Sequence, residues 1–395
     1  MAEKREVVVV SAVRAPIGSF GGTLKDHSST ALGARVVKEA IARAKIDPAR
    51  IGHLVCGNVI HSEPRDMYVS RVIALDAGMS KESCALTLNR LCGSGLQAIV
   101  TGANAIQLGD TDSAVGCGVE TMSRAGYLLP SGRWGARMGD AKLVDMMVGA
   151  LTDPFSPNHM GITAENIAEQ FKISRADQDA FALESQKRAV AAIAAGHFKT
   201  QIVPIEIQTR KGTVLFDTDE YPKADASAEG FAKLKPAFKK DGTVTAGNAS
   251  GINDGSAAVV LMEAAAAAKE GLKPMARLVS YGVAGVEPSI MGTGPIPAVK
   301  LALARAGLGL KDIDVIESNE AFAVQSLCVS RALEFDSAKV NPNGGAVALG
   351  HPLGATGTIL TVKCLYELAR IGKRYGLVTM CIGGGQGIAA IFERL

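Results

Sequence analysis

Residues 37–44 read VKEAIARA, and residues 299–306 read VKLALARA. The two segments align without a gap at an offset of 262 (299 − 37), and Ile51 and Ile313 keep the same offset (313 − 51). A constant offset over about fifteen residues indicates an internal repeat. We therefore expect a duplicated half-domain that contains a β-α-β unit.

The first copy of the repeat predicts a strand, a helix and a second strand. Residues 7–10 are a short, continuous β-branched run, which is typical of a buried parallel strand. Residues 31–44 carry apolar side chains at helical spacing, and residues 53–56 form the next apolar run. Strands that alternate with helices in this way indicate the α/β class.

The composition bounds the fold and the partners. The chain has 395 residues, more than the roughly 250–300 at which a single hydrophobic core stops growing, so we expect more than one core. Hydrophobic residues make up 47 % and aromatic residues only 5 %, which predicts aliphatic side chains in closely packed layers. The net charge of +3 is too small to indicate a nucleic-acid or membrane partner.

The cysteines and the first residues predict a cytoplasmic protein with reduced thiols. Seven cysteines is an odd number, and the polar start MAEKRE lacks the apolar segment of a secretory signal. No pair of cysteines has the spacing of zinc ligands, and we expect no metal. Five cysteines in apolar contexts are predicted to be core residues: Cys56, Cys84, Cys117, Cys328 and Cys364.

Three glycine-flanked segments, far apart in the chain, each present one reactive side chain. Cys92 lies in NRLCGSG, His351 lies in GHPLGATG, and Cys381 opens CIGGGQG. Cys92 follows the strand-like run 85–88, His351 follows the strand-like run 347–349, and a helix is predicted after each. Because open α/β sheets form their sites at the carboxyl ends of strands, we expect the three residues to meet in one active site.

The residue types indicate acyl transfer through a thioester. Cys92 at a helix N-terminus is placed to act as a nucleophilic thiolate. The flanking Gly93 and Gly95 are expected to let a substrate carbonyl approach the backbone. His351 is the expected base for the thiol proton. Because a nucleophile is already present, Cys381 is predicted to move a proton on the substrate carbon.

Each of these residues also has a structural interpretation. Cys92 and Cys381 could be inert core thiols, and a disulfide between them would require Cα atoms within roughly 7 Å. His351, between glycine and proline, could be a turn residue. Asn319 could bind a water that donates a hydrogen bond, or it could cap the helix that follows. Gly383 could donate its backbone N–H to a developing oxyanion.

Residues 120–249 interrupt the alternating pattern and are rich in Gly, Pro, Met, Lys and Asp. A helix is predicted over 175–195 within them. We expect an insertion from one half-domain that covers the site, and the alternative is a surface excursion without a role. The predicted boundaries are an N-terminal half-domain at 1–119, the inserted loop domain at 120–249, the end of the N-terminal half-domain at 250–272 and a C-terminal half-domain at 273–395.

These motifs resemble the thiolase family over essentially the whole chain. The match rests on the segments around Cys92, His351 and Cys381, on NASGINDG at 248–255 and on NEAFA at 319–323. Within the family, the sequence is most similar to bacterial short-chain β-ketothiolases (acetyl-CoA acetyltransferases). Together these motifs are highly specific.

The resemblance implies a fold and an activity. The fold would be two βαβαβ half-domains in a layered α-β-α-β-α core with the inserted loop domain, assembled as a homodimer or homotetramer. The activity would be the reversible Claisen condensation of acetyl-CoA with a second acetyl- or short acyl-CoA to 3-ketoacyl-CoA and CoA, without any cofactor beyond these substrates. The segment EPRDMY at 63–68 and the single Trp134 are similar to broader-range members linked to hydroxyalkanoate synthesis.

The resemblance also implies a role for each site residue. Cys92 would carry the acyl group, His351 would activate it, and Cys381 would take or return the α-proton. Asn319 would position a water that acts with His351, and the N–H groups of Cys92 and Gly383 would form the other oxyanion hole. Eight residues would contact coenzyme A: His159, Met160, Lys223, Phe238, Ala246, Ser250, Ala321 and Phe322.

The chain departs from the family pattern at Ser318, where alanine is usual. The basic residue for the CoA phosphates is best matched by Lys223. Other cations surround it in sequence: Arg210, Lys211, Lys233 and Lys235. Two other functions compete with a thiolase. A decarboxylating ketoacyl synthase would normally present histidine where Cys381 stands, and a non-catalytic acyl-CoA carrier would have no use for two placed thiols.

Overall fold

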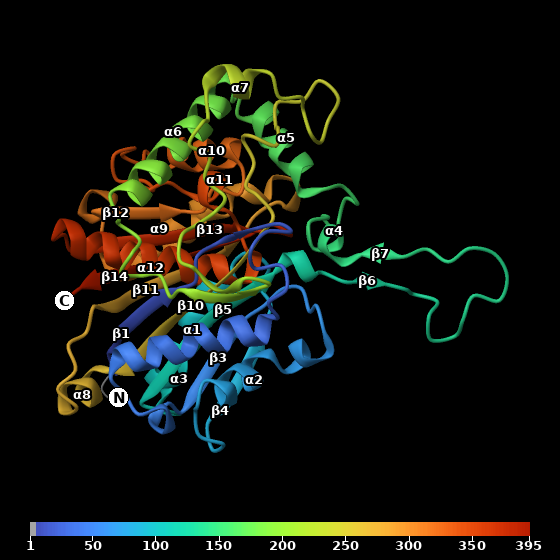
Figure 1. The fold of residues 1–395 in the computed structure, drawn as a ribbon. Helices are drawn as coiled ribbons and strands as arrows, with labels where there is room; N and C mark the ends of the chain where they lie inside the picture. Colours follow the sequence, from blue (N-terminus) through green and yellow to red (C-terminus); the bar gives the residue numbers. More distant parts are fainter. Residues whose placement is uncertain (1–4) are drawn as a thin grey trace.

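Both halves of the chain contribute strands to one sheet in the computed structural model, which describes residues 5–395 (Figure 1). The strands of this sheet are β1 (Val7–Arg14), β2 (Gly18–Ser19), β3 (His53–Gly57), β4 (Cys84–Leu88), β5 (Ser113–Thr121), β10 (Asn253–Glu263), β11 (Ala276–Gly285), β12 (Val315–Ser318), β13 (Tyr375–Ile382) and β14 (Gln386–Arg394). Their order is β12-β13-β14-β11-β1-β10-β5-β3-β4, and β2 pairs with β10.

The helices alternate with these strands along the chain. Those of the two halves are α1 (Ser29–Ala44), α2 (Val69–Asp76), α3 (Ser94–Leu108), α8 (Ala264–Lys269), α9 (Pro295–Ala306), α10 (Ala323–Ala332), α11 (Ala346–Leu349) and α12 (Leu353–Ile371). Five short 3₁₀ turns lie between them: Pro48–Arg50, Pro64–Tyr68, Met122–Arg124, Pro288–Thr293 and Leu310–Asp312.

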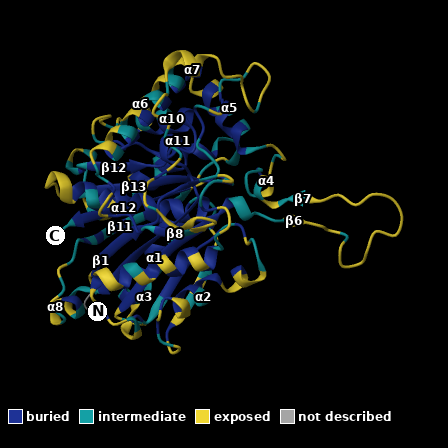
Figure 2. Ribbon diagram, in the orientation of Figure 1, coloured by how far each residue is buried: buried dark blue, intermediate teal, exposed yellow. Residues whose placement is uncertain are grey.

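The helices separate the strands into layers. α1 and α2 cover the outer face of the N-terminal strands, and α9 covers the outer face of β11 and β14. α3 and α12 pack against each other between the two groups, because α12 contacts β5 and β10 on one side and β12 and β13 on the other. The expected α-β-α-β-α arrangement is therefore confirmed, and the strands and middle helices are its most buried part (Figure 2).

The internal repeat is confirmed in three dimensions. α1 and α9 both stop at a residue in the left-handed region, Lys45 (φ 58°) and Gly307 (φ 67°), and these positions differ by 262 (307 − 45). β3 begins at His53 and β12 at Val315, which differ by the same number (315 − 53). Each half thus contains a helix that ends at a residue in the left-handed region and is followed by a strand, and the two copies keep a fixed spacing.

The predicted direction of the first strand was wrong. β1 pairs antiparallel with β10 along its whole length and antiparallel with β11 at Val8 and Val9. Parallel pairing is present elsewhere, between β3 and both β4 and β5 and between β12 and β13. The apolar run 7–10 indicates that both faces of β1 are buried, but it does not indicate whether the neighbouring strands are parallel or antiparallel.

Two further predictions about apolar segments were wrong. The run 347–349 before His351 belongs to the short helix α11 and not to a strand, because a few buried apolar residues fit either structure. Cys84 is exposed, since β4 is the last strand in the sheet order and its outward side has no cover. The other four cysteines predicted as core are buried as expected: Cys56, Cys117, Cys328 and Cys364.

The middle helices α3 and α12 cross so closely that only glycine fits between them. A Cβ atom on Gly357 would lie 2.2 Å from the backbone N of Leu96, and one on Gly95 would lie 2.7 Å from the backbone N of Thr358. This crossing holds one helix from each half against the other. It brings the N-termini of α3 and α12, and with them Cys92 and His351, to the same end of the middle layer.

A long excursion runs between β5 and β10. It contains β6 (Tyr127–Leu128), β7 (Val144–Asp145), α4 (Met146–Ala150), α5 (Met160–Gln170), α6 (Arg175–Ala194), β8 (Ile205–Thr209), β9 (Gly212–Phe216) and α7 (Ala228–Ala232). The helix predicted over 175–195 is α6, with Ser174 as its N-cap. A fully buried ion pair between Arg14 and Asp219 fastens the excursion to β1, with 2.7 Å between Nη1 and Oδ1.

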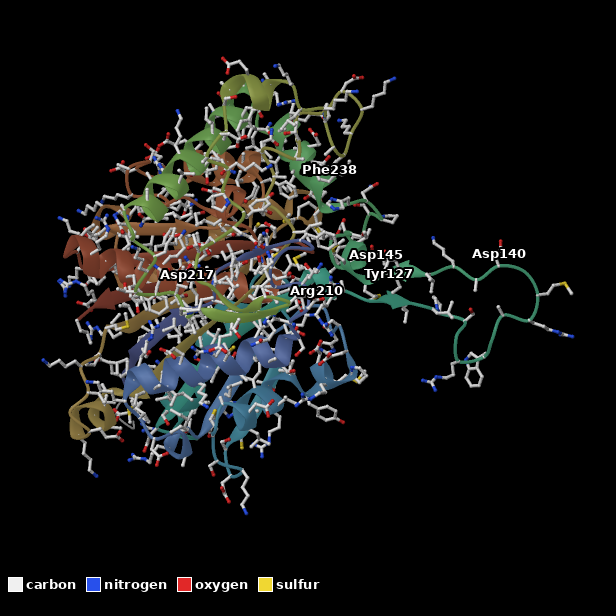
Figure 3. All side chains as sticks on the ribbon, viewed as in Figure 1. Tyr127, Asp140, Asp145, Arg210, Asp217 and Phe238 are labelled. Carbon is white, nitrogen blue, oxygen red and sulfur yellow. The ribbon has the colours of Figure 1, made fainter. Side chains whose placement is uncertain are left out.

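Part of the excursion leaves the body of the protein. β6 and β7 pair to form an arm that projects away, with Tyr127 and Asp145 at its base and Asp140 near its far end (Figure 3). Trp134 and Met138 on the arm are 88 % and 95 % exposed. Across residues 5–395 no helix is both long and apolar enough to cross a membrane.

Candidate active site

Cys92 lies in a tight turn between β4 and α3. Leu91 before it adopts φ 45°, which is costly for a residue with a branched side chain. The turn is held by two side chains: Asn89 Oδ1 accepts from Leu91 N–H at 2.9 Å, and Ser94 Oγ accepts from Arg90 N–H at 2.8 Å and donates to Leu91 O at 2.7 Å. These bonds fix the backbone that presents the thiol at the beginning of α3.

The surroundings of the Cys92 thiol keep it protonated. Burial raises its pKa to about 11, and the backbone N–H groups of Gly383 and of Cys92 itself act in the opposite direction. Both N–H groups therefore favour the thiolate form of Cys92. Gly383, predicted from sequence as an oxyanion donor, is thus brought beside the nucleophile although 291 positions separate them (383 − 92).

The glycines next to Cys92 do not serve the substrate as we expected. A Cβ atom on Gly93 would meet Ile382 Cδ1 at 2.6 Å, and one on Gly95 would meet the backbone of α12. Both positions face the protein interior, so their small size serves packing and not the approach of a carbonyl group.

His351 is buried and held from two sides. Its backbone N–H donates to Asn253 Oδ1 at 3.0 Å, and its Nδ1 lies 2.7 Å from Thr356 Oγ1. Burial lowers the pKa of His351 to about 4, so the ring is neutral near pH 7. Since the Thr356 hydroxyl donates to Pro352 O at 2.9 Å, it accepts from Nδ1–H, and Nε2 is left with a lone pair.

Asn319 stands at the carboxyl end of β12 with its side chain against His351. Its Nδ2 is 3.5 Å from His351 Nε2, and its buried Oδ1 has no hydrogen-bond partner among the described residues. The alternative that Asn319 caps the next helix is wrong, because α10 begins at Ala323 and its N-cap is Phe322. An unpaired buried amide oxygen beside the histidine fits the predicted binding of a water.

Cys381 lies near the end of β13, two residues before Gly383, and its side chain is fully buried. Burial is the main cause of a strongly raised pKa, and the nearby Cys92 contributes to it. The two thiols are therefore neighbours, and both are neutral at pH 7. Neither Cys381 nor Asn319 forms part of the cavity wall; each lies directly behind it.

A cavity of about 340 Å³ brings the predicted residues together. Cys92, His351 and Gly383 all line it. Its aromatic wall is Phe238, which lies beside α5 (Figure 3). The Phe238 ring stacks on His159 at 4.6 Å between ring centroids and meets Phe322 edge-on. Seven of the eight residues predicted to contact coenzyme A line this cavity: His159, Met160, Phe238, Ala246, Ser250, Ala321 and Phe322.

The eighth residue, Lys223, lines a second recess of about 210 Å³. Tyr221 and Ala246 form walls of both spaces, so the recess adjoins the cavity. The neighbouring cations in sequence do not line either space: Arg210, Lys211, Lys233 and Lys235. Of these cations, Lys223 alone lines one of the two spaces, together with the carboxylate of Asp225.

Glu120 and Thr356 belong to the site but were not recognised in the sequence. The buried Glu120 carboxylate accepts from Gly354 N–H at 2.7 Å, Ile60 N–H at 3.0 Å and Val59 N–H at 3.1 Å. Burial raises the pKa of Glu120 to about 7, although these three N–H groups lower it. In the sequence, the one indication was a glutamate near the end of an apolar strand, and the N–H groups that bind it come from two distant segments.

Across residues 5–395 no three side chains of His, Cys, Asp or Glu gather closely enough to hold a metal ion. The absence of a metal and of a further cofactor stays a prediction from the sequence.

Comparison with known proteins agrees with this geometry. Residues 7–265 match the family model of the thiolase N-terminal domain, and residues 272–394 match that of the thiolase C-terminal domain. The beta-ketothiolase BktB of Cupriavidus necator is 64 % identical over 392 residues, which cover 99 % of this chain and 100 % of that protein. An acetyl-CoA acetyltransferase of Escherichia coli is 50 % identical over 393 residues, with 99 % of this chain and 100 % of that protein covered.

Solved structures show the same similarity. Human mitochondrial 3-ketoacyl-CoA thiolase in complex with CoA superimposes with a TM-score of 0.96 at 45 % identity, covering 100 % of this chain and 99 % of that one. An acetyl-CoA acetyltransferase of Bacillus anthracis gives 0.98 at 45 % identity, with both chains covered completely. The chain therefore belongs to the thiolase family of acyltransferases, whose activity is the condensation of acyl-CoAs.

Proposed function

We propose that this thiolase works through an acyl-Cys92 intermediate, with His351 and Cys381 as two separate proton carriers. The observation that carries the proposal is the common cavity, which Cys92, His351 and Gly383 line, and the adjoining recess, which Lys223 lines. A thioester seated along this path has its carbonyl at the nucleophile and its nucleotide end at the cation.

The first half-reaction forms the acyl-enzyme. His351 Nε2 takes the proton of the Cys92 thiol while the sulfur attacks the carbonyl carbon of acetyl-CoA. The negative charge on the carbonyl oxygen is stabilised by the N–H groups of Cys92 and Gly383, the same groups that lower the pKa of the Cys92 thiol. The carbon–sulfur bond to CoA breaks, and Cys381 gives its proton to the leaving thiolate.

The second half-reaction forms the new carbon–carbon bond. The Cys381 thiolate takes the α-proton of a second acyl-CoA, whose thioester oxygen is stabilised by His351 and by a water on Asn319. The α-carbon attacks the acyl carbon, and the bond to Cys92 breaks. Cys92 recovers its proton from His351, so both thiols return to the neutral state, and thiolysis is the reverse sequence.

The same proposal covers the substrate range, assembly and location. The 64 % identity to a beta-ketothiolase supports short-chain 3-ketoacyl-CoA substrates of more than one length and a role in hydroxyalkanoate synthesis. The uncovered edge strand β4 and the exposed apolar side chains of the arm support a homodimer or homotetramer. Seven free cysteines support a reducing compartment, the cytoplasm. No cofactor beyond the CoA thioesters is part of the proposal.

Two variants test the assigned roles. Cys92→Ala is expected to gain no acetyl group from acetyl-CoA by intact-protein mass spectrometry. Cys381→Ala is expected to be acetylated but to exchange no α-proton of acetyl-CoA with deuterated solvent. Acetylation of Cys92→Ala at the active site would show that another residue is the nucleophile, and a wild-type protein without any adduct would favour the carrier. The companion measurement is thiolysis of acetoacetyl-CoA beside 3-ketohexanoyl-CoA.

A further inference from the structure

Glu120, near the end of β5, binds groups from both halves of the chain. Its side chain is fully buried. Oε2 accepts from Val59 N–H at 3.1 Å and from Gly354 N–H at 2.7 Å. Oε1 accepts from Ile60 N–H at 3.0 Å and from Asn58 Nδ2 at 3.2 Å. These four donors fill the roughly four acceptor positions of an ionised carboxyl group, so the contacts fit the charged form.

One of these donors belongs to the helix that follows the proposed base. Gly354 lies in the first turn of α12, three residues after His351, and the N-cap residue Pro352 makes no side-chain cap. The Glu120 carboxylate takes the place of a cap, and a negative charge is favourable at a helix N-terminus. A Cβ atom on Gly354 would lie 2.8 Å from Glu120 Oε2, so the absence of a side chain lets the carboxylate come this close.

The segment His351–Gly354 is bound at its other end as well. His351 N–H donates to Asn253 Oδ1 at 3.0 Å, and Asn253 Nδ2 donates to Gly18 O at 2.9 Å. Asn253 belongs to β10 and Glu120 to β5, which are neighbouring strands of the first half. The segment that carries the proposed base is therefore fastened to the half that carries the proposed nucleophile.

The other segment that Glu120 binds packs beside the nucleophile. Ile60, whose N–H donates to Glu120, belongs to the same apolar cluster as Leu353, the residue after Pro352. Cys92 packs against this cluster. One carboxylate thus holds together the surroundings of the thiol and the beginning of the helix that follows the imidazole.

We propose that Glu120 is a positioning residue for the proton transfer between Cys92 and His351, because its carboxylate holds the His351–Gly354 segment against the loop at residues 58–60. The inference rests on the proposed function, in which His351 takes the proton of the Cys92 thiol. Glu120 lines neither the cavity of about 340 Å³ nor the adjoining recess. It therefore acts on the rate of the chemical step and not on the binding of acetyl-CoA.

A purely electrostatic role of Glu120 would have the opposite sign. Burial is the main cause of the raised pKa of Cys92, and the negative charge of Glu120 adds to it. Removing this charge would favour the thiolate and speed the reaction of Cys92 with iodoacetamide, which does not use His351. Acetylation by acetyl-CoA uses His351 in the proposed mechanism, and it would slow if Glu120 positions the two groups.

Three variants separate these roles. In Glu120→Gln the side chain keeps its size, but an NH₂ group replaces one of the two acceptor oxygens. Glu120→Asp keeps the charge, but its shorter side chain cannot hold both segments. The matched control is Glu165→Gln, because the buried Glu165 also binds backbone N–H groups, those of Thr243 and Val244, which belong to neither segment.

The first assay measures single-turnover acetylation of Cys92 by mass spectrometry near pH 8, over a range of acetyl-CoA concentrations. At saturation both Glu120 variants are expected to react about 10- to 100-fold more slowly than the wild type, because a misplacement of about 1 Å can cost roughly 100-fold. The half-saturating concentration should stay within about twofold. Alkylation of Cys92 by iodoacetamide, in a Cys84→Ser background, should be unchanged or faster in Glu120→Gln. The control should match the wild type in both reactions.

The second assay follows the acetylation rate of the wild-type protein against pH. Burial raises the pKa of Glu120 to about 7, whereas the pKa values of Cys92 and His351 are about 11 and about 4. The Cys92–His351 pair therefore stays neutral between about pH 5 and 10. The rate should rise in one step near pH 7, as Glu120 loses its proton and accepts all four hydrogen bonds. Glu120→Gln should show no such step.

The groups around Glu120 allow a check of this step. Three ionisable residues lie close enough to interact with its charge: Asp66 in the turn Pro64–Tyr68, Cys56 on β3, and Cys92. Both thiols have raised pKa values and stay neutral in this range. After burial, the Asp66 carboxylate also contributes to the raised pKa of Glu120. Asp66→Asn should therefore move the step to lower pH and leave the rate above the step unchanged.

Slow acetylation with normal alkylation, in Glu120→Gln but not in Glu165→Gln, would support the inference. Acetylation of Glu120→Gln at the wild-type rate would overturn it, as would an equal loss of acetylation and alkylation. If Glu120→Gln does not fold, the wild-type pH profile decides, and a rate without a step near pH 7 would overturn the inference. A wild-type protein that gains no acetyl group would instead contradict the proposed function, and the inference with it.

Discussion

Replacing Thr356 by valine removes one hydroxyl group from behind the proposed catalytic base. In the structure this hydroxyl lies 2.7 Å from His351 Nδ1 and donates to Pro352 O, so it accepts the Nδ1 proton and leaves the Nε2 lone pair free. Asn319 Nδ2 faces Nε2 at 3.5 Å, which agrees with this tautomer. Valine has nearly the same shape as threonine but cannot accept a hydrogen bond.

The size of the effect follows from the burial of the ring. A buried Nδ1–H without an acceptor costs about 1–3 kcal/mol, and the neutral ring can avoid this cost by moving its proton to Nε2. That tautomer has no lone pair for the Cys92 proton. Acylation by acetyl-CoA is therefore expected to slow by about 5- to 150-fold, because each 1.4 kcal/mol is a factor of ten in rate.

The assay measures single-turnover acetylation of Cys92 by mass spectrometry, together with ¹⁵N NMR of the His351 ring to identify the tautomer. Thr356→Ser keeps the hydroxyl and should restore most of the rate and the wild-type ring signals. A valine variant that acylates at the wild-type rate would refute the reasoning. So would a slow valine variant in which the ring nitrogens keep their wild-type signals, since its defect would then be structural.

Two further predictions concern titration and buried charge. The pKa of Cys92 is raised to about 11 and that of His351 is lowered to about 4. In a Cys84→Ser background, the rate of Cys92 alkylation by iodoacetamide should therefore rise about tenfold per pH unit from pH 7 to 9. A rate that reaches its plateau near pH 6 would instead reveal a thiolate–imidazolium pair. Lys363 Nζ lies 2.8 Å from Glu317 Oε2 in the core, so Lys363→Met should lower the free energy of unfolding in urea by about 3–5 kcal/mol, and adding Glu317→Gln should recover part of the loss. Equal stability of the single and double variants would show that the uncompensated carboxylate is not the cause.

The sequence was most informative at the internal repeat and at the reactive residues in glycine-rich segments. The repeat at 37–44 and 299–306 predicted equivalent helices, and the structure places these helices on the two outer faces of the molecule. Cys92, His351 and Gly383 were recognised by their glycine-rich settings, and all three line a single cavity.

The remainder depends on partners that a single segment does not specify. The strand at 7–10 was assigned the wrong direction because its neighbours, β10 and β11, come from residues more than 240 positions away. Thr356 looks like an ordinary helical threonine until the fold turns its hydroxyl toward His351. Glu120 gains its N–H donors from the loop after β3 and from α12.

The duplication explains why the site needs both halves. The proposed nucleophile, Cys92, lies at the N-terminus of α3, and the proposed base, His351, lies just before α12. These helices are equivalent elements of the two halves, and they cross at Gly95 and Gly357. A thiol with a pKa of about 11 and an imidazole with a pKa of about 4 do not form an ion pair at pH 7, so acylation relies on moving a proton during the attack. Such a transfer tolerates little variation in distance. In the proposed mechanism, the glycine-only contact between the two helices therefore matters for catalysis, because it holds in place the helices that carry Cys92 and His351.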